Sequence, residues 1–186
     1  MTSKEFPPNS QRILYTMPNL TRIPLSNGWQ FKQAHTEEDF LPVHGFPTTN
    51  HLDLLYHQKI PDPTKDLNSD EIQWVGLKPW LYRTTFDHDE DTAENIVLVF
   101  EGLDTHSSIM LNGELLLKTD NMFLEYRVDV INKLKKLNNI LEIEFESTFL
   151  VGKALEKAQG FKNLFWNGDS SRMNVRKVPC HYGWDW

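Results

Sequence analysis

Short segments in which apolar and charged residues alternate place the strongest constraint on the fold of this chain. In residues 124–130 and 141–146, every second side chain is apolar and its neighbours are charged. A period of two is typical of a β-strand with one buried and one solvent-exposed face. Residues 80–86 favour a further strand, with Tyr82, Thr84 and Phe86 on one face, and the continuous apolar run 96–100 favours a buried strand.

Turn signals separate these segments. Asn-Gly is a strong hairpin signal, because both residues tolerate a positive φ. The pairs Asn27-Gly28 and Asn112-Gly113 therefore predict two hairpins, between the apolar runs 23–25 and 29–31 and between 109–111 and 115–117. A further apolar run within residues 46–60 ends at a predicted loop, Ile60-Pro61-Asp62-Pro63.

One segment has helical spacing instead. Leu150, Ala154, Leu155 and Ala158 predict a short helix over residues 150–159, which Gly160 could end. Residues 161–186 are rich in aromatics with little periodicity, and we expect an irregular segment that leaves the sandwich.

Together these patterns predict an all-β fold. Six to eight short strands joined by tight turns imply an antiparallel β-sandwich or jelly roll, here with one short helix. Residues 1–20 are expected to be a disordered lead-in. The sequence has neither the spacing of a βαβ unit nor a glycine-rich phosphate loop, which argues against a nucleotide-binding parallel sheet.

Charge and cysteine content restrict the partners and the compartment. The net charge is −7 and the basic residues are scattered, which argues against nucleic-acid binding. Cys180 is the single cysteine, so no internal disulfide is possible and a reducing compartment is favoured. No apolar run has the length of a signal peptide or a membrane-spanning helix, so we expect a cytoplasmic protein without a membrane partner.

The sequence carries no recognisable catalytic residue, metal site or cofactor site. The seven histidines lack the i, i+4 spacing of a helical zinc site, and there is no Cys-x-x-Cys. Cys180 and His181 are adjacent, and neighbouring side chains on an extended chain point to opposite sides, so they form a poor dyad. The acidic stripe Glu142, Glu144 and Glu146 is interpreted as a solvated strand face.

The end of the chain carries the most specific pattern. Arg176-Lys177 precedes His181-Tyr182-Gly183-Trp184-Asp185-Trp186, and two Trp around one Asp are rare by chance. This ending resembles a signature of the β-mannosidases of glycoside hydrolase family 2. The resemblance runs from about residue 20 to 186 and includes, in order, 27–31, 51–55, 60–63, 73–76, 80–83, 100–105, 111–113, 121–123 and 126–130. Without a signal sequence, the chain looks like the fungal intracellular branch of that family.

The resemblance implies that residues 21–186 are the amino-terminal jelly roll, a galactose-binding-like sandwich, of a larger enzyme with immunoglobulin-like domains and a TIM barrel. Such an enzyme hydrolyses terminal, non-reducing β-D-mannose residues of β-mannosides with retention, by means of two barrel Glu. These Glu are absent here, so this chain alone is expected to be inactive. Its implied partners are the β-mannoside substrate and the downstream barrel.

The same resemblance implies a substrate-binding role for three residues. Asp185 would accept hydrogen bonds from hydroxyls of the mannose in the catalytic subsite, and Trp184 and Trp186 would wall that subsite. The alternative is that both Trp only pack the domain junction and that Asp185 only stabilises its loop.

Three functions are compatible with the sequence. The chain is a fragment of a β-mannosidase, a stand-alone carbohydrate-binding or lectin-like module, or a non-binding relic whose aromatic segment 161–186 exposes an apolar patch.

Overall fold

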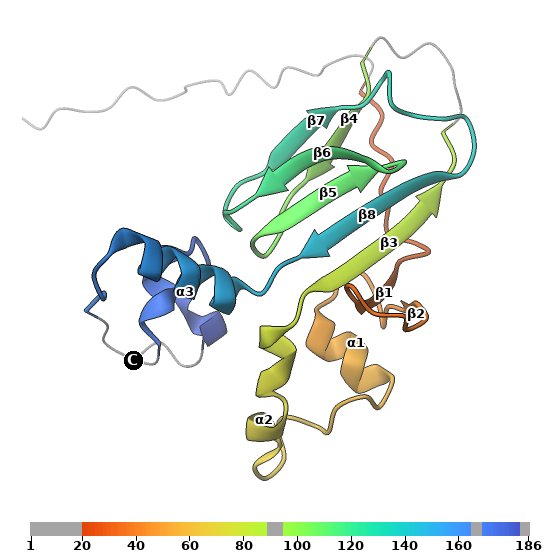
Figure 1. The fold of residues 1–186 in the computed structure, drawn as a ribbon. Helices are drawn as coiled ribbons and strands as arrows, with labels where there is room; N and C mark the ends of the chain where they lie inside the picture. The colour runs from red at the N-terminus through yellow and green to blue at the C-terminus, as the bar shows by residue number, and fades with distance from the viewer. Residues whose placement is uncertain (1–19, 89–94, 165–168, 183–186) are drawn as a thin grey trace, which may run out of the picture.

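The computed structural model of this chain describes residues 20–88, 95–164 and 169–182, so most of the expected lead-in lies outside it. A six-stranded antiparallel sheet in the order β2-β1-β3-β8-β5-β6 lies beside a two-stranded sheet of β4 and β7 (Figure 1). The strands are β1 (Gln30–Gln33), β2 (Leu41–Pro42), β3 (Trp80–Phe86), β4 (Val97–Phe100), β5 (Ser107–Leu111), β6 (Glu114–Thr119), β7 (Tyr126–Asp129) and β8 (Asn139–Phe145). The predicted strand-rich sandwich is confirmed.

Helices lie at one end of the large sheet, beside the start of β3 and the end of β8 (Figure 1). They are α1 (Asn50–Tyr56), α2 (Asn68–Glu71), α3 (Thr148–Gln159) and the 3-10 helices η1 (Gln73–Leu77), η2 (Ser170–Asn174) and η3 (Pro179–Tyr182). The predicted helix over 150–159 is confirmed as α3, but the expectation of a single helix is wrong. None of the helices within the described ranges is long and apolar enough to cross a membrane.

The long central strands follow their sequence patterns. β3 pairs along its whole length with β8, from Trp80 opposite Phe145 to Phe86 opposite Asn139. Leu141 and Ile143 of β8 are buried, and Glu142 and Glu144 lie on the other face, as period-two alternation predicts.

The two Asn-Gly pairs behave differently. Asn112 and Gly113 both have positive φ and join β5 to β6, which confirms that hairpin. Gly28 also has positive φ, but residues 23–25 form no strand, and β1 pairs instead with β2 and β3. An Asn-Gly turn fixes the local chain direction, whereas a hairpin also needs a strand partner on both sides.

Two apolar clusters hold these elements together. The first lies between the two sheets and contains Trp29, Phe100, Leu103, Ile109, Leu141 and Ile143. The second lies where the helices α1 and η1 meet β1 and β3, and contains Phe31, Leu54, Ile60, Ile72, Val75 and Trp80. Burying large apolar side chains contributes about 1.5–3 kcal/mol each, so the helical end has a core of its own.

The strand predicted from the continuous apolar run 96–100 is present as β4. The prediction that this strand is buried is wrong for two of its residues. Val97 and Val99 are 44% and 41% exposed, while Phe100 belongs to the core between the sheets. Leu98 and Phe100 pack into the core between the two sheets, so the alternating Val97 and Val99 lie on the opposite face of β4.

The apolar run around residues 51–55 forms helix α1. Thr49 caps it by accepting a hydrogen bond from Leu52 N at 3.3 Å. Asp53 is fully buried and accepts from His44 N at 2.7 Å, Thr48 Oγ1 at 2.7 Å and Tyr82 Oη at 3.0 Å. These donors satisfy a buried carboxylate that would otherwise be very costly, and they tie α1 to β3.

Helix α3 is fixed at both ends and packs closely against η2. Ser147 caps its start by accepting from Leu150 N at 3.2 Å, and Gly160 ends it with a φ of 79°. Gly152 is buried so tightly that an added Cβ would lie 2.6 Å from the carbonyl oxygen of Ser171. Leu150 and Leu155, whose spacing predicted the helix, do not lie on the face that packs against η2. Both are exposed.

We predict that Gly152→Ala lowers the free energy of unfolding by about 1–2 kcal/mol. Alanine is intrinsically better than glycine in a helix by about 1 kcal/mol, but overpacking costs typically about 1–3 kcal/mol and here meets a backbone atom. Urea denaturation of both proteins measures the difference. Gly76→Ala is the matched control, because nothing lies within 4 Å of its added Cβ. A Gly152→Ala chain as stable as the natural one would contradict the close packing.

Candidate functional site: the Asp104 cluster

The residues that the sequence singled out for sugar binding, Trp184, Asp185 and Trp186, lie outside the described residues. The structure does describe the segment that leads to them, residues 169–182. Asp169 opens η2 by accepting from Ser171 N at 2.8 Å, and Lys153 of α3 lies 2.6 Å from the same carboxylate. The first residues of this segment are thus held against helix α3.

The chain then returns to the sandwich, so the prediction that this segment leaves it is wrong for residues 176–181. Arg176 forms a parallel bridge with Asn121, and its carbonyl accepts from Met122 N at 3.1 Å. Val178 N donates a hydrogen bond to Met122 Sδ at 3.0 Å. Tyr126 of β7 steadies the receiving loop, because its hydroxyl donates to Asn121 O at 3.0 Å.

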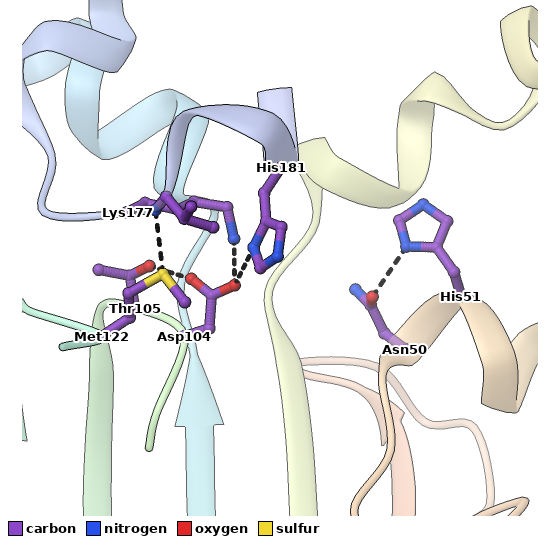
Figure 2. Close-up of polar contacts among 8 residues, drawn as sticks. Asn50, His51, Asp104, Thr105, Met122, Lys177 and His181 are labelled. Carbon is purple, nitrogen blue, oxygen red and sulfur yellow. Dashed lines mark hydrogen bonds and ion pairs between the residues drawn. The ribbon is translucent and has the colours of Figure 1, made fainter. Parts of the chain in front are cut away.

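Asp104 makes the charged part of this attachment, as Figure 2 shows. It lies in the loop between β4 and β5, and Lys177 donates to its Oδ2. His181 Nδ1 is 2.9 Å from the same oxygen, and Thr105 Oγ1 donates to Oδ1. The Lys177 side chain is 16% exposed, while those of Asp104 and His181 are 31% and 45% exposed, so this ion pair is partly shielded from water.

Electrostatics keep the Asp104 carboxylate ionised. Burial alone would raise its pKa, but the hydrogen bonds from Lys177 and Thr105, the charge of Lys177 and the contact with His181 together hold the pKa below its ordinary value. Because the folded-state pKa is depressed, Asp104 contributes stability above the ordinary carboxyl pKa of about 3.9. This contribution is lost as the pH falls through the folded-state value.

Three further titratable groups surround this cluster. Burial lowers the pKa of His106, against the opposing charges of Glu146, Asp120 and Asp104. Burial, and then the positive charge of Lys177, lowers the pKa of His51 on α1. Burial raises the pKa of Tyr182 to about 12, with Asp104 adding to the rise.

The cluster is built to hold a segment rather than to transfer protons. A carboxylate held ionised by a lysine is a poor general acid near neutral pH. No group of His, Cys, Asp and Glu within the described part of the chain could hold a metal ion. Cys180 is exposed while the ring of its neighbour His181 faces Asp104, so His181 is engaged with a carboxylate.

Sequence reasoning did not select Asp104, Lys177 or His181 as site residues. Asp104 lies 73 positions before Lys177 and 77 before His181, so no local sequence pattern could relate these residues. The available signal was the resemblance itself, which included residues 100–105 and Arg176-Lys177 without assigning them a contact.

Comparison with known proteins places the chain in a family. Residues 29–186 match the family model described as glycosyl hydrolase 2 galactose-binding domain-like, and the chain belongs to that family. It is 46% identical over 167 residues to β-mannosidase B of Thermothelomyces thermophilus and 42% identical over 175 residues to β-mannosidase B of Aspergillus fumigatus. These matches cover 88% and 91% of this chain but 20% and 21% of the relatives, so the chain spans about a fifth of their length.

A solved structure agrees with this placement. The β-D-mannosidase from Dictyoglomus thermophilum superposes with a TM-score of 0.80 at 35% identity, over 87% of this chain and 20% of that one. The exo-chitosanase from Amycolatopsis orientalis, at 20% identity and a TM-score of 0.58 over 66% of this chain and 16% of that one, shares the fold. The predicted galactose-binding-like sandwich is therefore confirmed.

We predict that Lys177→Met raises the pKa of both Asp104 and His51. Removing the cation withdraws the charge that favours the carboxylate and disfavours the imidazolium, so both pKa values move up. NMR titration of the two side chains measures the shifts. Lys133→Met, which removes a lysine paired with Glu114 elsewhere, should leave both values unchanged. If His51 keeps its pKa in Lys177→Met, the proximity of these groups is contradicted.

Proposed function

We propose that this chain is the amino-terminal, non-catalytic domain of a retaining β-mannosidase and supplies part of its mannose subsite. One observation carries the proposal: the segment directly before Trp184-Asp185-Trp186 is fastened to the sandwich through Lys177 and His181, on Asp104. A loop that supplies a sugar ligand needs such an anchor, because binding groups must be held in place before the substrate arrives. The identities to proteins named β-mannosidase B support the choice of sugar.

In this proposal, the domains downstream supply the two Glu that carry out the reaction. One Glu attacks the anomeric carbon, and the other protonates the leaving group and then activates water. Asp185 accepts hydrogen bonds from hydroxyls of the same mannose, and Trp184 and Trp186 line the subsite. A carboxylate suits this role because hydrogen bonds to an ionised acceptor are stronger than neutral ones.

The exposed apolar side chains near the end of the described chain support a partner domain. Leu150 and Leu155 of α3 are exposed, as are Phe161 at 66%, Leu164 at 97% and Met173 at 59%. Apolar surface of this kind is often covered by another domain. We propose that the downstream part of the same polypeptide covers it, because the relatives are about five times as long as the matched region.

The test uses the longest natural product of the reading frame that encodes this chain. We predict that this product hydrolyses an aryl β-mannoside and that Asp185→Asn lowers its kcat/KM by about 10²–10⁴-fold. Two hydrogen bonds to a charged group are worth about 1.5–3 kcal/mol each, and 1.4 kcal/mol is a factor of ten. Asp70→Asn, an exposed carboxylate on α2, is the control and should retain activity.

The 186-residue chain by itself is expected to show no hydrolysis of the same substrate. Turnover by this chain, or a longer product that is equally active with Asp185→Asn, would contradict the proposal.

A further inference from the structure

The segment 176–182 touches two loops of the sandwich that are distant from it in sequence. One is the loop of residues 120–123, which makes backbone contacts with Arg176 and accepts a hydrogen bond from Val178 N on Met122 Sδ. The other is the loop between β4 and β5, which contributes the carboxylate of Asp104. The first contact fixes residues 176–178 and the second extends the attachment as far as His181.

Both oxygens of Asp104 are used, and in different ways. Oδ1 is held from its own loop by Thr105, which is fully buried. Oδ2 receives Lys177 and His181 from the segment that must be held. The carboxylate is therefore fixed by the sandwich on one side and binds two side chains of the segment on the other. An acceptor held in this way restrains both the distance and the direction of its partners.

The distance from this anchor to the proposed sugar-binding residues is short along the chain. His181 precedes Asp185 by four residues, and an extended chain spans at most about 3.5 Å per residue, or about 14 Å here. Fixing His181 therefore limits where Asp185 can lie. Releasing it would move the point of attachment back to residues 176–178 and enlarge the volume that Asp185 can explore.

We propose that Asp104 is the positioning residue for the Trp184-Asp185-Trp186 segment, and that it acts through Lys177 and His181. The anchoring of residues 177–182 by Asp104 stands on the contacts alone. Its effect on mannoside hydrolysis rests on the proposed function. Asp104 does not itself contact the sugar in this proposal, so its effect on catalysis passes through Asp185.

The anchoring is tested first in the 186-residue chain by hydrogen–deuterium exchange and mass spectrometry. Asp104→Asn and Lys177→Met should each raise the exchange of peptides covering 177–186 by about tenfold or more, because each removes a charge-assisted hydrogen bond. Peptides from β3, β5 and β8 should keep their protection. Lys177→Arg retains the cation and should restore most of the protection lost in Lys177→Met.

Glu142→Gln is the matched control, because it neutralises a carboxylate whose Oε1 lies 2.6 Å from Arg83 Nη2 across β3 and β8, away from the segment. It should leave the exchange of 177–186 unchanged. Asp104→Asn and Lys177→Met chains that exchange in 177–186 like the natural chain would overturn the proposal. An equal rise over β3, β5 and β8 in both variants would also overturn it, because Asp104 would then stabilise the whole domain.

The second test is a double-mutant cycle in the longer, active product. Asp104→Asn alone should lower kcat/KM on an aryl β-mannoside by about tenfold, and should add little to the loss caused by Asp185→Asn. Residues that act through one another are non-additive, whereas independent sites add. Full additivity would overturn the positioning role. If Asp185→Asn has no effect, the proposed function fails, while the exchange experiment still decides the anchoring.

Discussion

The bonds that Asp104 makes with Lys177 and His181 organise the end of the chain. They connect the loop between β4 and β5 to a segment more than 70 residues away, and hold that segment as far as His181. The pairing restrains the segment because two of its side chains share one oxygen of the carboxylate, while the buried Thr105 holds the other oxygen. A single surface ion pair is worth little, but a carboxylate that accepts hydrogen bonds from three side chains restrains the direction of its partners.

The rest of the fold provides the rigid support for this pair. Apolar side chains between the sheets, such as Leu103 just before Asp104, fix the loop that presents the carboxylate. At the helical end, a second apolar cluster and the buried Asp53 fix α1 and η1 on β1 and β3. The segment 169–182 then runs from α3, where Gly152 permits a close approach, to the two loops of the sandwich. This arrangement fits the proposed function, in which the sandwich positions a sugar-binding segment and the downstream domains carry out the hydrolysis.

Local patterns predicted the elements whose environment is itself local. The alternation in β3 and β8 and the Asn112-Gly113 turn all have their predicted structure, because each depends on neighbours a few residues away. The run at 51–55 became a helix because Thr49 caps it and Leu54 enters a core made by distant segments. Val97 and Val99 are exposed because they alternate along β4 with Leu98 and Phe100, which pack into the core between the two sheets. Asp104 could not be selected, since its partners are set by tertiary structure. The roles of Trp184, Asp185 and Trp186 remain predictions from the resemblance.

The most direct test of this account is a crystal structure of the longest natural product of this reading frame with a mannose-configured inhibitor bound. The account predicts that the Asp185 carboxylate lies within hydrogen-bond distance of hydroxyls of the inhibitor, while Asp104 remains bonded to Lys177 and His181 at the base of the same segment. A structure in which Asp185 points into its own sandwich, with the sugar held by other residues, would contradict it.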